Sequence, residues 1–431
     1  MIFVSNSITQ TWLYRAGLFA LALLPVAHLT SLGVMEMAGF LLFVTSAGLF
    51  LMECVTDAPL AFSRVRSIVA LPVFGYGIIT IISTLMMLES VDDQLAVLSE
   101  LKWILYFFAF AYFFERFANS SWCSYLGPFL IVIALMGVFA LLQFFFGWEF
   151  PRAVRVVDPV GDFFRVTGFF NVPQSFAGNT GMAVLFVVGI LSCNYVRPWK
   201  SNLPVLFFAA PPIILGSIAV LLTLTRSAWL AWAAVLIFAA GRVRLTWSFF
   251  AAFLMACCLA QIVQSNGIIA ARLLSDTGHH QASIEQRIEI WQANWQMLTD
   301  YPLLGVGPEK NIERIDEYYD STALHRRIAS AHNNVLEVAT TRGIFAAVSY
   351  CLVAAYFLIT ALRLANSSDA GVLVSAVATG SLYAQVYFHI LGIVDNNFFD
   401  REAKNLIIFV WALTSAASIR RHKSTSGKCA F

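Results

Sequence analysis

Apolar segments of about 20 residues recur along the whole chain, and this feature constrains the fold more than any other. The chain of 431 residues is 59% hydrophobic and only 12% charged, whereas soluble domains carry about 25% charged residues. A bilayer offers no water to hydrogen-bond exposed backbone groups, so segments of this kind are expected to cross it as α-helices. The sequence therefore predicts an all-α fold, that of a polytopic membrane protein.

About twelve transmembrane helices are expected. In chain order they are Trp12–Thr30, Val34–Val55, Ile68–Leu88, Leu101–Phe117, Leu126–Phe146, Phe176–Val196, Leu203–Leu224, Ser227–Gly241, Leu245–Ile262, Val335–Leu364, Gly371–Val394 and Ala403–Ile419. The eighth segment is short and directly follows the seventh, so these two could also be divided differently. No charged leader with a cleavage site precedes the first segment, which is expected to stay in place as an anchor.

Basic residues are concentrated in alternate short connections, which sets the expected orientation. If the N-terminus is cytoplasmic, the inner connections and the tail are basic, whereas the outer connections Ser31–Gly33 and Glu89–Asp93 have no basic residue. The basic residues of the inner connections are Arg64, Arg66, Arg116, Arg197, Lys200, Arg242, Arg244 and Arg363. Both termini are therefore expected inside.

One long polar segment, Gln264–Ala331, interrupts the apolar pattern on the expected outer side. Loops of this length in a compact fold are usually functional. We expect one integrated membrane domain, with helices one to nine in residues 1–263, the outer loop in residues 264–331, and helices ten to twelve with a tail in residues 332–431. The seven cysteines are scattered outside the outer loops, so neither a disulfide framework nor a cysteine metal site is expected.

Arginines gather on the expected outer side. Arg152, Arg155 and Arg165 lie between the fifth and sixth spans, Arg226 lies between the seventh and eighth, and Arg287 lies in the long loop. A guanidinium group donates two parallel hydrogen bonds to a phosphate and keeps its charge. Any one of these arginines could instead reach to lipid headgroups, but outer basic residues are disfavoured unless something needs them. The set is therefore expected to converge on one phosphate-bearing ligand.

An amphipathic helix is expected over Ala282–Leu298. Its apolar residues recur at helical spacing and form one stripe, with Arg287 beside the stripe and therefore at the seam with the membrane domain. An ordinary surface position for Arg287 is the alternative. The stripe consists of Ile284, Ile288, Trp291, Trp295 and Leu298. Two glycines and two prolines in Tyr301–Pro308 then predict a tight turn that leads back toward the membrane.

His332 ends the long loop and is the candidate general base. With Ser330 as the expected N-cap, His332 would lie in the first turn of a helix, where the helix dipole and nearby arginines disfavour the charged imidazolium. A neutral histidine can accept a proton from a hydroxyl group. A capping or packing role is the alternative, and we assign packing roles to His28 and His389, which lie within apolar spans.

Several short motifs follow one another in a fixed order. They are Arg165-Val-Thr-Gly168-Phe-Phe-Asn171, Leu224-Thr-Arg226-Ser-Ala-Trp229, the helix containing Arg287, Pro302-Leu-Leu-Gly-Val-Gly307, and His332-Asn333-Asn334 followed by Arg342-Gly343. Their order and spacing resemble the O-antigen ligase and polymerase superfamily. The resemblance covers most of the chain, with motifs from about residue 160 onward and the expected topology throughout.

The resemblance implies a GT-C-like glycosyltransferase in the bacterial inner membrane, with its active site facing the periplasm, a long periplasmic loop and cytoplasmic termini. Such an enzyme moves O-antigen from undecaprenyl diphosphate onto a hydroxyl of the lipid A-core oligosaccharide, with inversion and without a metal or another cofactor. By this similarity Arg226 and Arg287 would bind the diphosphate and His332 would activate the acceptor. Asn333, Asp395 and Asn397 are candidates for contacts with the sugar.

Other functions remain open from the sequence. The chain ends soon after its last span, which favours the ligase over the protein O-oligosaccharyltransferases of the superfamily; the O-antigen polymerase has similar motifs. A transporter of lipid-linked glycans would need charged or broken helices near the membrane midplane, whereas here the charges gather on one side. The expected partners are the lipid-linked donor, the lipid A-core acceptor and membrane lipids, and not nucleic acid.

Overall fold

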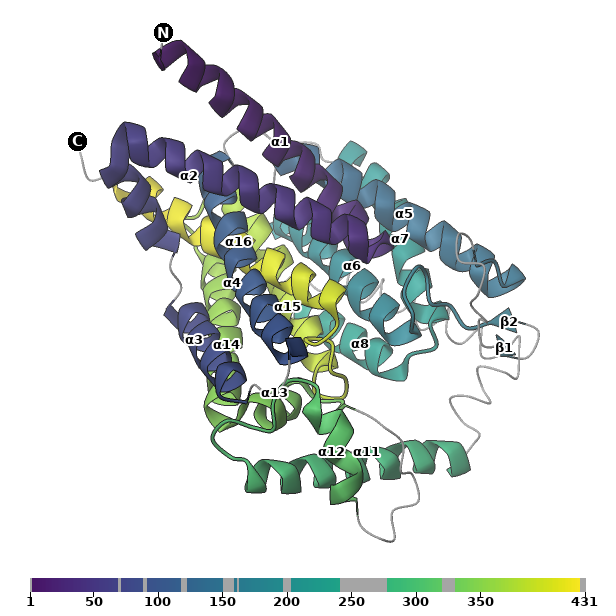
Figure 1. Cartoon of the computed structure of the whole chain (residues 1–431). Coiled ribbons are helices and arrows are strands. Elements are labelled where there is room, and N and C mark those ends of the chain that lie inside the picture. Colours follow the sequence, from purple (N-terminus) through teal and green to yellow (C-terminus); the bar gives the residue numbers. More distant parts are fainter. Residues whose placement is uncertain are drawn as a thin grey trace.

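A computed structural model describes residues 2–68, 71–87, 91–117, 122–149, 159–160, 163–196, 203–240, 277–319 and 330–426. Long helices form a bundle, and α11, α12 and α13 lie across one end of it (Figure 1). The bundle helices are α1 (Ile2–Thr30), α2 (Leu32–Ile68), α3 (Leu71–Met86), α4 (Val91–Phe117), α5 (Trp122–Phe146), α6 (Pro173–Val196), α7 (Leu203–Leu222), α8 (Arg226–Ala240), α14 (Ile344–Asn366), α15 (Val372–Leu391) and α16 (Arg401–Ser426).

Three further helices and a small hairpin complete the described structure. The helices across the end of the bundle are α11 (Thr277–Asp300), α12 (Lys310–Tyr318) and α13 (Asn334–Arg342). Strands β1 (Pro159–Val160) and β2 (Phe163–Phe164) pair in antiparallel register after α5.

The helices agree with the expectation of a helical membrane protein. Within the described part of the chain, five helices are long and apolar enough to cross a membrane: Ile8–Thr30, Leu32–Asp57, Gly127–Phe146, Pro173–Cys193 and Ile344–Asn366. Most of the other expected spans also coincide with helices, whereas Leu245–Ile262 lies outside the described residues. The all-helical class is therefore supported, and the number of twelve spans stays a prediction.

The expected tenth span, Val335–Leu364, is wrong as a single helix. Gly343 has φ +84° and ψ 171°, and it ends α13 and precedes α14. A Cβ atom at this position would overlap the carbonyl group of Leu303, because the turn after α11 passes directly against it. The membrane helix therefore begins at Ile344, and α13 belongs to the layer across the end of the bundle.

Helix α15 is central in the bundle, where it packs on α6, α8, α14 and α16. Its closest approach is to α6, because Gly189 faces Gly380 and a Cβ on Gly189 would lie 2.6 Å from the Gly380 Cα. Small residues of this kind let two membrane helices pack backbone to backbone. Tyr387 of α15 also donates a 2.9 Å hydrogen bond to the carbonyl oxygen of Ala177 in α6. These contacts fix the end of α15, where the candidate site begins.

The start of α1 and the end of α16 lie at the end of the bundle opposite α11, α12 and α13 (Figure 1). This arrangement agrees with the expectation that both termini lie on one side of the membrane and the long loop on the other.

Candidate functional site

His332 lies just before α13, in a sharp turn. The N-cap of α13 is Asn333, whose side-chain oxygen accepts a 3.0 Å hydrogen bond from the backbone N–H of Leu336. The expected N-cap, Ser330, is therefore wrong, and His332 lies outside the helix rather than in its first turn. Its φ of +45° places it in the left-handed region, which is uncommon for a residue with a side chain.

The two asparagines after His332 join this turn to the connection between α15 and α16. The backbone N–H of Asn334 donates to the Gly392 carbonyl at 2.8 Å, and the Asn333 amide donates to the Ile393 carbonyl at 2.9 Å. The Asn334 amide also donates to Asn397 Oδ1 at 2.6 Å. The sequence His332-Asn333-Asn334 therefore positions its histidine through long-range hydrogen bonds from both asparagines.

These bonds bring His332 beside Asp395. The His332 Nδ1 atom lies 3.8 Å from Asp395 Oδ1, and the two side chains are 37% and 13% exposed. This distance is longer than a hydrogen bond but suits an ion pair once the imidazole is protonated. In this pair His332 can act as a base, and the carboxylate of Asp395 can stabilise the protonated imidazole.

Asn333 and Asn397, both expected near the acceptor sugar, have structural hydrogen bonds. Asn397 is only 4% exposed, its oxygen accepts from Asn334, and its amide donates to the Phe388 carbonyl at 3.1 Å. Asn333 uses its oxygen for the cap and its amide for Ile393, but it remains partly exposed. Of the three sugar-contact candidates, Asp395 and Asn333 keep surface that a ligand can reach.

A second carboxylate, Asp400, ends the same connection. Its Oδ2 accepts a hydrogen bond from the hydroxyl of Ser175 in the first turn of α6. Burial raises the pKa of Asp400 to about 6; the Ser175 hydrogen bond opposes this, whereas Asp395 and Glu402 add to it. The start of α6 is therefore anchored to the segment that carries Asp395.

Arg165 and Arg226 come together at the junction of α7 and α8. Arg165 Nε donates to the Thr223 carbonyl at 2.9 Å, three residues before Arg226 begins α8. Leu224, with φ +53°, makes the bend between them. Helix α6 starts beside Asp400 and runs away from it, and α7 packs on α6 and returns, so this junction lies at the same end of the bundle as His332. Arg152 and Arg155 lie outside the described residues.

Arg287 lies on α11, and the expected apolar stripe is only partly buried, because Leu298 is buried and Trp291 is half-buried whereas two other members are exposed. Ile288 and Trp295 are 46% and 61% exposed. The buried face of α11 consists of Ile290, Ala293 and Met297, which pack against Val306, Ile315 and Tyr319. Residues of α12 and of the turn before it determine which face of α11 is buried. The periodicity of the sequence does not reveal these partners.

A neighbour of Arg287 nevertheless contacts the His332 turn. The indole N–H of Trp291 donates a 2.8 Å hydrogen bond to the carbonyl oxygen of Ala331. Residues four apart on a helix lie about 6 Å apart on one face, so Arg287 lies one turn from the segment that carries His332. The side chain of Arg287 is partly exposed.

Glu337 is a site residue that sequence reasoning missed. It is buried, its Oε2 accepts from the Ala331 N–H at 2.5 Å, and its Oε1 accepts from the Asn311 amide at 3.0 Å. Burial raises the pKa of Glu337 against the opposing effect of both hydrogen bonds. The signal was available, because Glu337 is a carboxylate inside a segment expected to be an apolar membrane span.

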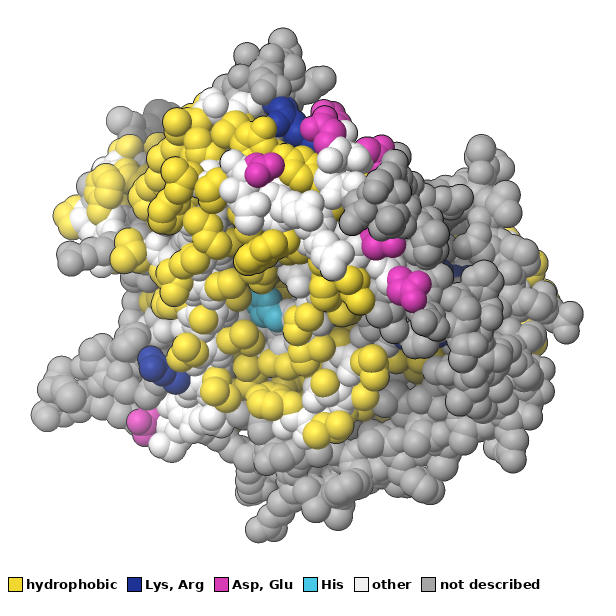
Figure 2. Space-filling view, turned by 90° about the horizontal axis from the view of Figure 1, so that it is seen from below, with side chains coloured by type: hydrophobic (Ala, Val, Ile, Leu, Met, Phe, Trp, Pro, Cys, Tyr) yellow, Lys and Arg dark blue, Asp and Glu magenta, His cyan; other side chains and the backbone are white. Residues whose placement is uncertain are grey.

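The face that carries these residues is mixed in character. Figure 2 shows it from below, with a histidine side chain in a hollow bordered mainly by hydrophobic side chains. Across the described ranges, no three or more His, Cys, Asp or Glu side chains form a group that could hold a metal ion. Metal independence itself stays a prediction.

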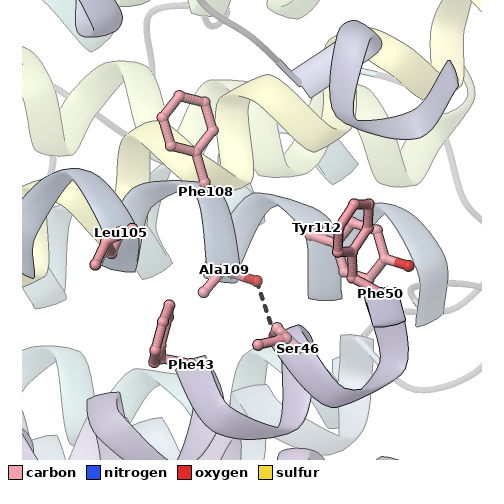
Figure 3. Close-up of a pocket in the computed structure, with 8 residues that line it drawn as sticks. Phe43, Ser46, Phe50, Leu105, Phe108, Ala109 and Tyr112 are labelled. Atoms are coloured by element: carbon pink, nitrogen blue, oxygen red, sulfur yellow. Dashed lines mark hydrogen bonds between the residues drawn. The ribbon is translucent and has the colours of Figure 1, made fainter. Parts of the chain in front are cut away.

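A separate cavity of about 300 Å³ lies between α2 and α4, away from these residues. Phe43, Phe50, Leu105 and Phe108 line much of it, and Ser46 donates to the Ala109 carbonyl at 3.1 Å (Figure 3). Its lining is mostly apolar and the hydroxyl of Tyr112, which also lines it, donates to Glu53, so it is not the candidate site.

The fold and the site define a helical membrane protein with arginines and a histidine–aspartate pair at one end of its bundle. The family model described as O-Antigen ligase matches residues 211–351, from α7 into α14, a segment that includes Arg226, Arg287 and His332. This match supports membership of the chain in the O-antigen ligase family. No curated protein matches the chain significantly.

Proposed function

We propose that the protein is an O-antigen ligase: an inverting, metal-independent glycosyltransferase of the inner membrane. It moves O-antigen from undecaprenyl diphosphate to a hydroxyl of the lipid A-core oligosaccharide on the periplasmic side. The observation that carries this proposal is the partly exposed His332 with Asp395 beside its Nδ1, within the segment that the family model matches.

In this proposal His332 is the general base. Asp395 lies on the Nδ1 side of the ring, which leaves Nε2 to accept the proton from the acceptor hydroxyl. The imidazole becomes positively charged as the proton moves, and a carboxylate at ion-pair distance stabilises that charge and orients the ring. The deprotonated hydroxyl then attacks the anomeric carbon, the bond to the diphosphate breaks on the opposite face, and the configuration inverts.

The arginines bind the leaving group. Negative charge grows on the diphosphate as the glycosidic bond breaks, and fixed cations aimed at it lower the barrier. Arg226 and Arg287 would hold the diphosphate, and Arg165 would support Arg226 through their shared junction at Thr223. Guanidinium groups then take the role that a divalent cation has in other phosphate-processing enzymes.

The O-antigen polymerase is the second candidate, because the family match is compatible with either member of the superfamily. The experiment that separates them is deletion of the gene followed by analysis of lipid-linked glycans. A ligase predicts full-length O-antigen that accumulates on undecaprenyl diphosphate. Single repeat units on lipopolysaccharide would instead assign the polymerase and overturn the proposal.

A further inference from the structure

The backbone of Ala331, which precedes His332, is held at both its N–H and its carbonyl group. Its N–H donates to Glu337 Oε2 at 2.5 Å, and its carbonyl oxygen accepts from the indole N–H of Trp291 at 2.8 Å. Glu337 lies on α13 and Trp291 lies on α11, so two different elements hold the two peptide groups that flank the Ala331 Cα. Ala331 itself is fully buried.

These two hydrogen bonds fix the backbone next to His332, whose own backbone conformation is unfavourable. His332 has φ +45°, and a non-glycine residue adopts such a conformation only where its surroundings enforce it. On its other side, Asn333 and Asn334 are fixed by hydrogen bonds to Ile393 and Gly392. The chain is therefore fixed immediately before and immediately after His332, while the ring remains partly exposed.

Glu337 also joins this turn to α12. Its second oxygen accepts from the amide of Asn311, which is fully buried. The Asn311 side-chain oxygen has no hydrogen-bond partner among the described residues. A glutamine at position 337 could therefore still accept from Ala331, and it could donate to Asn311 if that amide turned over. The Glu337→Gln variant can therefore keep these hydrogen bonds while it removes the negative charge.

We infer that Glu337 and Trp291 are positioning residues that fix the backbone of His332 and thereby aim its imidazole at the acceptor hydroxyl. This inference rests on the proposed function, because it concerns the general base of that reaction. Neither residue touches the reacting atoms, so both act on turnover and not on donor binding.

The first test compares Glu337→Ala with Glu337→Gln in the full-length protein in lipid nanodiscs. Glu337→Ala is expected to lower kcat about 10–100-fold, as loss of an orienting partner typically does, with the Kd for the undecaprenyl diphosphate-linked donor unchanged. Glu337→Gln is expected to restore most of the turnover. Glu313→Ala, a change at an exposed site on α12, is the control and should behave as wild type. A glutamine variant as inactive as the alanine variant would overturn the inference, because charge and not hydrogen bonding would then matter.

The second test removes a single N–H group, that of the Trp291 indole. Trp291→Phe keeps the ring packing but removes the donor to Ala331, and it is expected to lower kcat with donor affinity unchanged. Trp295→Phe is the matched control, because Trp295 lies one turn further along the same helix and is largely exposed. Equal turnover in the two phenylalanine variants, or a parallel loss of donor affinity in Trp291→Phe, would overturn the inference.

A readout without transfer separates this inference from the proposed function. The rate at which diethyl pyrocarbonate modifies His332, measured by mass spectrometry of the His332 peptide, reports the environment of the ring. Trp291→Phe and Glu337→Ala should change this rate, and Trp295→Phe and Glu337→Gln should not. If wild type transfers no glycan but these rate changes occur, the proposed function fails and the positioning role stands. Unchanged rates in all four variants would overturn the positioning role whatever the activity.

Discussion

Different neighbours set the backbone and the side chain of His332. The backbone is fixed by the hydrogen bonds of Ala331 and by those of Asn333 and Asn334. The ring lies beside Asp395. A base built this way needs little reorganisation when the acceptor arrives, which favours the transfer step.

Replacing His332 with alanine should abolish proton removal and leave donor binding intact. The expected loss is about 10²–10⁴-fold in turnover, the usual contribution of a general base. Donor affinity and turnover are measured separately in the purified variant. If both fall together, the histidine binds the diphosphate or supports the fold, and it is not the base.

Asp395→Ala should lower turnover by about 10–100-fold, because the imidazolium loses its stabilising carboxylate and the ring its orientation. Asp395→Asn should fall between alanine and wild type, since the asparagine keeps the shape and polarity of the side chain beside Nδ1 but carries no charge. The comparison is made as kcat at saturating donor and acceptor. An alanine variant with wild-type kcat would remove Asp395 from the mechanism.

Asp400 should make stability depend on pH. Burial raises the pKa of Asp400 from 3.8 to about 6, so the folded protein holds this proton more tightly than the unfolded chain does. Its stabilising contribution is therefore present below pH 3.8 and is lost as the pH rises to about 6. Asp400→Asn cannot ionise and should lack this decline, with a gain on the order of 1 kcal/mol at pH 7.

The measurement for Asp400 is the thermal unfolding of the detergent-solubilised protein across this pH range. Asp369→Asn, at an exposed position between α14 and α15, serves as the control. A pH profile of Asp400→Asn that parallels wild type would contradict the assignment.

The sequence identified His332 but not the conformation that holds it. Serine and asparagine are both good N-caps, so residues 330 and 333 could not be separated by local rules. Asn333 is the N-cap because its amide also donates to the Ile393 carbonyl, a contact across 60 positions of sequence. Glu337 was missed for a related reason, since both of its partners lie on neighbouring segments that only the fold brings together.

At the scale of elements, the turn after α11 is a spacer between α11 and α14. The carbonyl of Pro302 accepts from the Ile344 N–H at 2.9 Å, and the Val306 N–H donates to the Thr340 carbonyl at 2.8 Å. Pro302–Gly307 therefore packs along α13 and its junction with α14. The expected tight turn is present here, and its glycines let the backbone approach the α13–α14 junction closely.

Gly343→Ala should destabilise the protein by about 3 kcal/mol or more, because it combines a positive φ with a clash against the Leu303 carbonyl. Gly371→Ala, before α15, is the matched control: its φ is −59° and an added Cβ would meet no atom within 4 Å. The midpoint of thermal unfolding in detergent checks both variants. Equal midpoints would show that the junction tolerates a side chain and that this account of the α13–α14 break is wrong.

Hydrophobic periodicity predicted the existence of most elements but not their buried faces. It found the helix around Arg287 and most bundle helices, because long apolar or amphipathic runs carry a strong local signal. It could not choose the buried face of α11, since both Trp295 and Met297 are apolar and only α12 decides which one is covered. It also joined α13 to α14, because α13 has apolar residues near its start and the polar stretch Thr340–Arg342 before Gly343 is short.

At the scale of the whole molecule, the candidate site lies at one end of the bundle and not along a pathway through it. Lys102, near the middle of α4, and Glu36, near the start of α2, form a 2.7 Å ion pair. His332, Asp395 and Asp400 lie outside the bundle helices, in the connections at one end. A transporter would need such groups near the midplane. The bundle does, however, bury neutral polar side chains such as Asn179 and Gln385, and also the side chains of Glu53 and Glu115.

Transfer by purified protein in the presence of a chelator is the decisive test of an inverting glycosyl transfer without a metal. Wild-type protein in vesicles would receive undecaprenyl diphosphate-linked O-antigen, lipid A-core acceptor and excess EDTA, and the product would be analysed for its anomeric configuration. Glycosylated lipid A-core with inverted configuration is expected at an undiminished rate, because arginines and not a metal neutralise the leaving diphosphate. Transfer that stops with EDTA and returns with added magnesium, or a product with retained configuration, would contradict it.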